Sequence, residues 1–281
     1  LLYGSAMQVR DAAWIQKLMG YLQAGRIAYS ASCINTSMEA MSTEQLVRYY
    51  YYSARHLKDM LGVDSSGVAM MVDNPSICWA NIDIMADAGI KYMYLGPNFN
   101  PNTPHTLTEM YPRLFYMTGR NPKNKVLILS GTLYNLDEMQ FVYDGPNATP
   151  VALDTTVQCV SDALINRYQV DNYPYDAVVQ MVDQYWDNGP LFAQVMQRVR
   201  QMSERKDAKG RPYVFPKFFN SNMKDFCQYI EEKYSGDIAS YRGTIENWWC
   251  FGTPSDAYCA AQVREAHDLL PAAETLATLA S

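Results

Sequence analysis

The chain has 281 residues, of which 48% are hydrophobic and 19% are charged, and its net charge is −6 at pH 7. This balance is typical of a globular protein with a sizeable core and excludes a disordered chain. The acidic balance and the lack of any basic run argue against nucleic acid or an anionic membrane surface as partners. No apolar stretch reaches the roughly 18 residues of a membrane span. The first residues, Leu1 to Ser5, carry no starting Met, which indicates that the true start of the protein is missing.

Residue types narrow the kind of site to expect. The 22 tyrosines and 5 tryptophans suit the surface of a sugar or another amphipathic ligand, although packing accounts for most aromatic side chains. The six cysteines are far apart and form no C-x-x-C pair, which excludes a zinc ribbon or a thioredoxin-type site. Two N-x-S/T triplets, at Asn35 and Asn147, are too short to identify a compartment.

The first predicted elements are a helix and a strand. Ser42 to Gln45 form a capping box, and apolar residues follow at helical spacing as far as Leu61, with Gly62 as the stop signal. Residues 67–72 then form a continuous apolar run, which predicts a strand covered on both faces. Asp73 stands at the carboxyl end of this strand.

The next elements predict a βαβ unit. Residues 74–76 break the strand, 77–88 form a helix ended by Gly89, and 90–95 form a second strand, so the sheet is expected to be parallel. The stretch 96–125 is rich in Pro and Asn, which indicates an elaborated loop over a site, and 126–130 resume as a strand.

The remaining chain predicts further helices. The expected elements are a helix from 154 to about 168, a loop at 185–190, an amphipathic helix at 191–205, a strand at 214–219, a helix at 222–234 and an Ala-rich helix from 255 to the end. The fold class is therefore α/β, with residues 1–235 as an incomplete parallel (β/α) barrel. Residues 236–281 are expected to be a linker and the first helix of a helical bundle.

Asp73 is the leading candidate for chemistry by position alone. Catalytic groups of alternating strand–helix barrels sit at the carboxyl ends of the strands, where a carboxylate serves as nucleophile, metal ligand or general base. The structural alternative is that Asp73 caps the helix that starts near Ile77.

Several blocks then carry a resemblance to a known family. They are Met41–Arg48, Ala54–Leu57, Val72–Ser76, Ala86–Tyr92, Tyr173–Asp176, Asp187–Pro190, Tyr241–Gly243, Asn247–Trp249 and Ala273–Glu274. In order and spacing they resemble the amino-terminal α/β domain of glycoside hydrolase family 38, the α-mannosidases and their bacterial relatives. The similarity extends from about residue 25 to the end and implies a retaining α-mannosidase-like hydrolase with a carbohydrate substrate.

By this resemblance Asp73 is both the covalent nucleophile and one ligand of a catalytic zinc ion. The zinc would position the sugar and stabilise charge as it shifts. The family's other zinc ligands match positions before the start and after the end of this chain, so the resemblance implies truncation at both ends. Only Asp73 of the four ligands is assigned, and the three histidines, His56, His105 and His267, have no ligand spacing among themselves.

A retaining mechanism also needs a second carboxyl group. Glu246 is the only acid between Tyr241 and Trp249, which makes it the candidate acid/base, with a surface glutamate as the alternative. Trp248 and Trp249 are candidates for stacking on a sugar, or for packing between domains, and Tyr241 is a candidate substrate-binding residue.

Two other functions are compatible with parts of the sequence. One is a catalytically inactive, glycan-binding pseudo-enzyme or fragment that keeps an aromatic cleft without the zinc. The other is deacetylation on a related barrel, which needs a pair of histidines at short spacing that this chain lacks.

Overall fold

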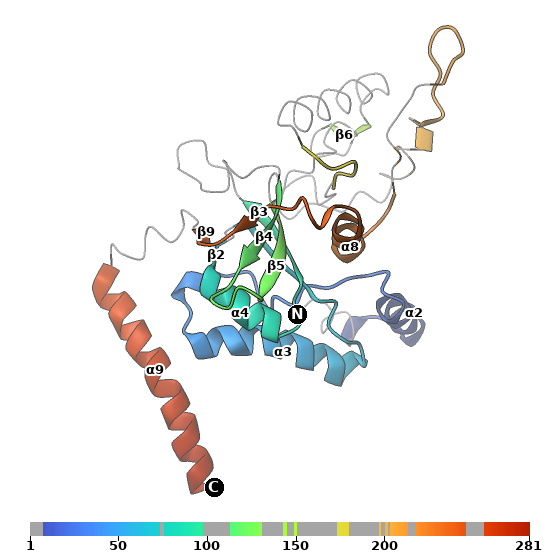
Figure 1. The fold of residues 1–281 in the computed structure, drawn as a ribbon. Helices are drawn as coiled ribbons and strands as arrows, with labels where there is room; N and C mark the ends of the chain where they lie inside the picture. Colours follow the sequence, from blue (N-terminus) through green and yellow to red (C-terminus); the bar gives the residue numbers. More distant parts are fainter. Residues whose placement is uncertain are drawn as a thin grey trace.

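The computed structural model describes the sheet, the helices around it and the carboxyl-terminal helix (Figure 1). The residues it describes are 8–73, 76–97, 113–130, 143–144, 149–150, 173–179, 197, 200–201, 203–212, 217, 219–245 and 256–281. The helix predicted for 154–168 and the loop at 185–190 lie outside these residues, as does most of the strand predicted for 214–219. Of the described positions in the helix predicted for 191–205, Gln197, Arg200, Gln201 and Ser203 are helical, whereas Glu204 and Arg205 lie past its end.

A five-stranded sheet forms the centre of the fold, in the order β1–β3–β5–β4–β8. The strands are β1 (Val68–Asp73), β3 (Tyr92–Pro97), β4 (Arg113–Thr118), β5 (Lys125–Ser130) and β8 (Ser240–Tyr241). β1, β3 and β5 are mutually parallel, whereas β4 runs antiparallel to β5 and β8 runs parallel to β4. The α/β class and the three parallel strands confirm the sequence prediction. Within the described residues the sheet is open, with β1 and β8 at its edges.

Strand β4 corrects the prediction of an elaborated loop over residues 96–125. Its residues Leu114 to Met117 are all buried, and a turn from Gly119 to Asn124 returns the chain directly into β5. A connection this short joins only antiparallel neighbours, because a parallel crossover needs about a dozen residues or more. The prediction of a wholly parallel sheet was therefore wrong. The apolar run at 114–117 could have indicated this strand, but the many Pro and Asn residues around it favoured the prediction of a loop.

Helices cover both faces of the sheet. On one face, α3 (Thr43–Leu61) and α4 (Trp79–Asp87) pack against buried side chains that include Met71, Met93 and Ile128. On the other face, α8 (Met223–Tyr234) covers a second cluster that includes Tyr94 and Leu127. Complete burial of each such side chain contributes about 1.5–3 kcal/mol. In the edge strand β1 this cover is incomplete: Ala69 and Met71 are buried, but Met70 is 38% exposed, so the predicted burial of this strand on both faces is confirmed only in part.

Smaller elements complete the described chain. They are α2 (Ala12–Gln23), the short 3-10 helix η1 (Met38–Ala40), the paired strands β2 (Ile77–Cys78) and β9 (Thr244–Ile245), the paired strands β6 (Tyr143–Asp144) and β7 (Thr149–Pro150), and α9 (Ala257–Ala280). No helix among the described residues is both long enough and apolar enough to cross a membrane.

The predicted helix ends are confirmed where capping chemistry determines them. The Ser42 hydroxyl accepts from the Gln45 amide at 3.2 Å while the Gln45 side chain accepts from the Ser42 amide at 2.9 Å, which completes the capping box of α3. α3 ends at Gly62, whose left-handed backbone (φ 61°) is accessible to glycine at little cost. Asn222 caps α8 in the same manner, by accepting from the Asp225 amide.

Helix α9 is almost detached from the rest of the described chain. None of its residues is buried, although it presents large apolar side chains such as Leu276 and Leu279. Its Glu274 carboxylate binds the Arg48 guanidinium of α3 through two hydrogen bonds, at 2.9 and 2.6 Å. The helix predicted from residue 255 is confirmed, and its place in a bundle domain stays a prediction.

Asp83 on α4 fixes the turn between β4 and β5. Its carboxylate accepts hydrogen bonds from the Arg120 amide at 2.8 Å, the Asn121 amide at 3.3 Å and the Asn124 side chain at 2.8 Å. Gly119 is required beside it, because an added β-carbon would lie 2.4 Å from Asp83 Oδ1. The half-buried carboxylate thus ties the hairpin to the helix layer.

Replacing this carboxylate tests its role in the fold. Asp83→Ala is expected to lower the free energy of unfolding by about 2 kcal/mol, because three donors lose a charged acceptor. Asp87→Ala, on the exposed end of the same helix, is the matched control and should change it by less than about 0.5 kcal/mol. Urea unfolding of both variants gives the comparison, and equal values would show that Asp83 does not hold the hairpin.

Glu231 of α8 joins two strands through tyrosine hydroxyls. Tyr92 donates to Glu231 Oε2 at 2.7 Å and Tyr116 donates to Oε1 at 2.6 Å. Burial first, and then these bonds to the carboxylate, raise the pKa of both phenols above the ordinary value. Burial also raises the pKa of Tyr49, on α3, to about 12. All three phenols are therefore held in the neutral form by the folded chain.

Stability is expected to fall at alkaline pH for this reason. The unfolded chain loses its phenolic protons near pH 10, whereas the folded chain holds them to higher pH, so the stabilisation is complete below about pH 9 and is lost progressively as the pH rises from about 10 through the raised pKa values of the folded chain. Urea unfolding across this range, with phenolate absorbance as the readout of ionisation, measures the effect. A free energy of unfolding that stays constant to about pH 11 would contradict it.

Candidate active site

Asp73 ends the edge strand β1, at the carboxyl edge of the three parallel strands. It pairs in register with Pro97, the last residue of β3, and β5 ends at Ser130 along the same edge. Its predicted position at the carboxyl end of a parallel strand is confirmed. The structure describes only the backbone of Asp73, so the predicted orientation of its carboxylate toward a cleft stays a prediction. The capping alternative was wrong, because Cys78 is the N-cap of α4.

The free edge of β1 is covered by residues 30–35. The Ala31 amide donates to the Val68 carbonyl at 2.7 Å, and the Met70 amide donates to the Ser30 hydroxyl at 3.0 Å. Asn35 makes two contacts with one residue: its Nδ2 donates to the Val72 carbonyl at 2.6 Å, and its Oδ1 accepts from the Val72 amide at 3.3 Å. Side chains thus replace a neighbouring strand and satisfy the exposed edge. In the sequence, Asn35 was notable only as part of an N-x-S/T triplet.

A two-residue ladder brings a distant segment next to the one that follows Asp73. Ile77 pairs with Ile245 and Cys78 pairs with Thr244, in antiparallel β2 and β9, and both isoleucines are fully buried. The segment of Tyr241–Ile245 is therefore adjacent to the chain four residues beyond Asp73. The other candidates on this segment, Glu246, Trp248 and Trp249, lie outside the described residues, and their roles stay predictions.

Tyr241 is described, and its contacts are with the protein. Its ring meets that of Phe115 edge to face, with centroids 6.2 Å apart, and its hydroxyl donates to the Thr244 carbonyl at 3.4 Å. A β-carbon at Gly243 would lie 2.4 Å from this hydroxyl, so the glycine allows the close turn between β8 and β9. Tyr241 therefore shapes the turn that leads into β9, and contact with substrate stays a prediction.

The block Tyr173–Asp176 anchors its segment to α8. The Tyr175 and Tyr234 rings pack with centroids 5.1 Å apart, and the Asp176 carboxylate accepts from the Tyr229 hydroxyl at 2.9 Å and from the Lys233 ammonium. The Lys233 hydrogen bond is the main cause that lowers the pKa of Asp176 to about 2. One of the blocks that carry the family resemblance thus has a structural role on the outer side of the fold.

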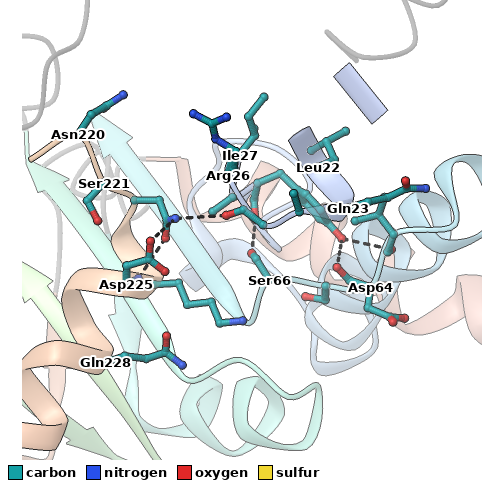
Figure 2. A pocket seen from close by; sticks show the side chains of 18 of the residues that line it. Leu22, Gln23, Arg26, Ile27, Asp64, Ser66, Asn220, Ser221, Asp225 and Gln228 are labelled. Carbon is teal, nitrogen blue, oxygen red and sulfur yellow. Dashed lines mark hydrogen bonds between the residues drawn. The ribbon is translucent and has the colours of Figure 1, made fainter. Parts of the chain in front are cut away.

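Figure 2 shows a polar hollow of about 700 Å³. Residues 62–66, which precede β1, line it, so it lies at the opposite end of this strand from Asp73. It is lined by the end of α2, by residues 62–66 just before β1, and by the start of α8. Its polar groups mostly hold these three segments together: Asn222 donates to the Gly25 carbonyl at 3.4 Å, and Ser66 donates to the Tyr29 carbonyl at 2.6 Å. Because the hollow lies before β1 begins and Asp73 lies where β1 ends, the two are separate features.

The residues described do not fit a zinc ion. Among them, no group of three or more His, Cys, Asp and Glu side chains is arranged to hold a metal. His56 stacks on Tyr52 of its own helix, with ring centroids 5.5 Å apart, His267 lies on the detached α9, and His105 is outside the described residues. Asp73 therefore stays the one residue assigned to the zinc site that the family resemblance implies.

Comparison with known proteins gives a fold relative. No known family matches the sequence, and no curated protein matches it. In structure the chain is similar to an alpha-mannosidase from Enterococcus faecalis V583, with a TM-score of 0.57 and 15% sequence identity over 82% of this chain. The similarity covers 23% of the length of that protein. At this identity the comparison shows a shared fold, and membership in family 38 stays a prediction.

The metal prediction follows from the ligand inventory. This 281-residue chain is expected not to retain zinc, because one carboxylate supplies far less than the three or four ligands that a zinc site needs. Elemental analysis after dialysis against a metal-free buffer, with and without prior zinc loading, is the measurement. One zinc ion retained per chain would show that residues outside the described ones complete a site.

Proposed function

We propose that this chain is part of a retaining glycoside hydrolase that acts on α-mannosides, with Asp73 as the nucleophile. The observation that carries the proposal is an aspartate at the carboxyl end of a parallel strand in a chain that shares the fold of an alpha-mannosidase. Carboxylates at strand ends of this kind are held by a rigid backbone while the loops beyond them contact the substrate. The fold shared with the alpha-mannosidase does not by itself specify chemistry, so the proposal depends on Asp73.

The pairing of β2 with β9 supports Glu246 as the second carboxyl group. Because the two strands are antiparallel, β9 runs from Thr244 opposite Cys78 to Ile245 opposite Ile77, which is toward the Ser76 end of β2. Asp73 lies on that same side, three residues before Ser76. Asp73 and Glu246 are 173 positions apart in the sequence (246 − 73), yet the segments next to them are paired directly through β2 and β9.

The proposed reaction has two displacements. In the first, an Asp73 carboxylate oxygen bonds to the anomeric carbon as the bond to the leaving-group oxygen breaks, and Glu246 gives its proton to that oxygen. In the second, Glu246 removes a proton from water, the water oxygen bonds to the anomeric carbon, and Asp73 is released. The geometry this requires is a separation of about 5–5.5 Å between the two carboxyl groups.

Substitution of the nucleophile tests the proposal. In the full-length protein that contains this chain, Asp73→Asn is expected to lower kcat for an aryl α-mannoside at least about a thousand-fold, because an amide cannot form the glycosyl-enzyme. Asp87→Asn, an exposed aspartate after the same βα junction, should keep full activity and serves as the matched control. An active Asp73→Asn variant would overturn the assignment, and an inactive full-length wild type would favour a glycan-binding role without catalysis.

The same assay separates the role of Glu246. Glu246→Gln is expected to lose turnover of a natural disaccharide but to retain formation of the glycosyl-enzyme from a substrate with a good leaving group, because such a group departs without a proton. Comparing the two substrates by rapid-quench kinetics distinguishes the steps. Equal loss on both substrates would show that Glu246 is not the general acid.

A further inference from the structure

We infer that Asn35 is a positioning residue for Asp73, an inference that rests on the proposed function. Asn35 lies 38 positions before Asp73, 73 − 35, on the segment that covers the free edge of β1. The Val72 carbonyl that accepts its 2.6 Å hydrogen bond belongs to the peptide group whose nitrogen is that of Asp73. Asn35 therefore acts directly on the peptide plane from which the Asp73 side chain starts.

The two contacts on Val72 restrict this plane in a way that one contact would not. The Asn35 carboxamide carries a donor and an acceptor in the same geometry as a backbone peptide group, so it imitates the strand that an edge lacks. Its Oδ1 accepts from the Val72 amide at 3.3 Å while its Nδ2 donates to the Val72 carbonyl. The peptide groups on both sides of Val72 are thereby held at the last position before the strand ends.

The constraint acts on the side of β1 that lies away from β3. In the described sheet β1 is an edge strand, and both the amide and the carbonyl of Val72 are bonded there by Asn35. On its other side β1 is paired with β3 as far as Asp73, so Asn35 adds a second restraint next to the proposed nucleophile. A displacement of about 1 Å at a reacting group costs up to about 100-fold in rate, so a second restraint at this point has a kinetic effect.

Asn35→Asp is the sharpest test, because it changes one donor and almost no volume. The carboxylate keeps an acceptor for the Val72 amide but places an unpaired oxygen against the Val72 carbonyl. We expect kcat for an aryl α-mannoside to fall about 10- to 100-fold with KM changed less than about two-fold. Since Asn35 is exposed, the unfolding midpoint in urea should change little.

The pH profile distinguishes positioning from a general structural defect. A protonated aspartic acid carries an O–H donor, so the ratio of variant to wild-type kcat is expected to rise as the pH falls toward the pKa of the new carboxyl group. Asn220→Asp, which adds the same charge at an exposed asparagine near the hollow, is the control and should show a ratio near one at every pH. Hydrogen exchange at the Val72 amide should accelerate in Asn35→Ala and not in the control variant.

The outcomes separate this inference from the proposed function. If Asp73→Asn abolishes activity while Asn35→Asp retains the kcat of the wild type, the inference is wrong and the proposed function stands. If the full-length wild type is inactive, or Asp73→Asn is active, the proposed function fails and the positioning role fails with it. Unchanged exchange at Val72 in Asn35→Ala would show that the two hydrogen bonds are absent in solution.

Discussion

The fold depends on the burial of three parallel strands on both faces. β1, β3 and β5 carry side chains that alternate between two separate apolar clusters, one under α3 and α4 and the other under α8. Neither cluster is enclosed without its helices, so the βαβ connection, the hairpin and α8 must dock together. The carboxyl ends of the three strands are therefore rigid, since the backbone of each strand is held by the packed core on its faces.

Polar groups at the margin of this core determine how the pieces are oriented. Asp83 binds the β4–β5 turn to α4, Glu231 binds Tyr92 and Tyr116 to α8, and Asn35 binds the loop before α3 to β1. Each of these side chains reaches from a helix or a loop to a strand or to a turn between strands, and each bonds with two or more groups. Apolar burial is not directional, so contacts of this type select one register among several that would bury the same surface.

At the proposed site, too, strand pairing and polar side-chain contacts together hold the backbone. Asp73 is held through its backbone by β3 on one side and by Asn35 on the other, while β9 brings the segment before Glu246 next to β2. The polar hollow in Figure 2 lies at the amino end of β1. The groups that line it hold together α2, α8 and the residues just before β1. The proposed chemistry at the carboxyl ends of the strands and structural contacts at their amino ends are the arrangement expected of a strand–helix fold.

Local patterns in the sequence determined α3, α4, α8, α9 and the three parallel strands, whereas α2 was not predicted, and only the tertiary structure decided how the edges of the sheet are completed. The capping box at Ser42, the stop at Gly62 and the apolar run before Asp73 act within a few residues, so periodicity and capping predict them. The pairing of β4 with β8, the pairing of Ile77 with Ile245 and the contacts of Asn35 with Val72 join residues far apart in the chain. No short pattern encodes such contacts, because their free energy arises only when the core has already brought the partners together.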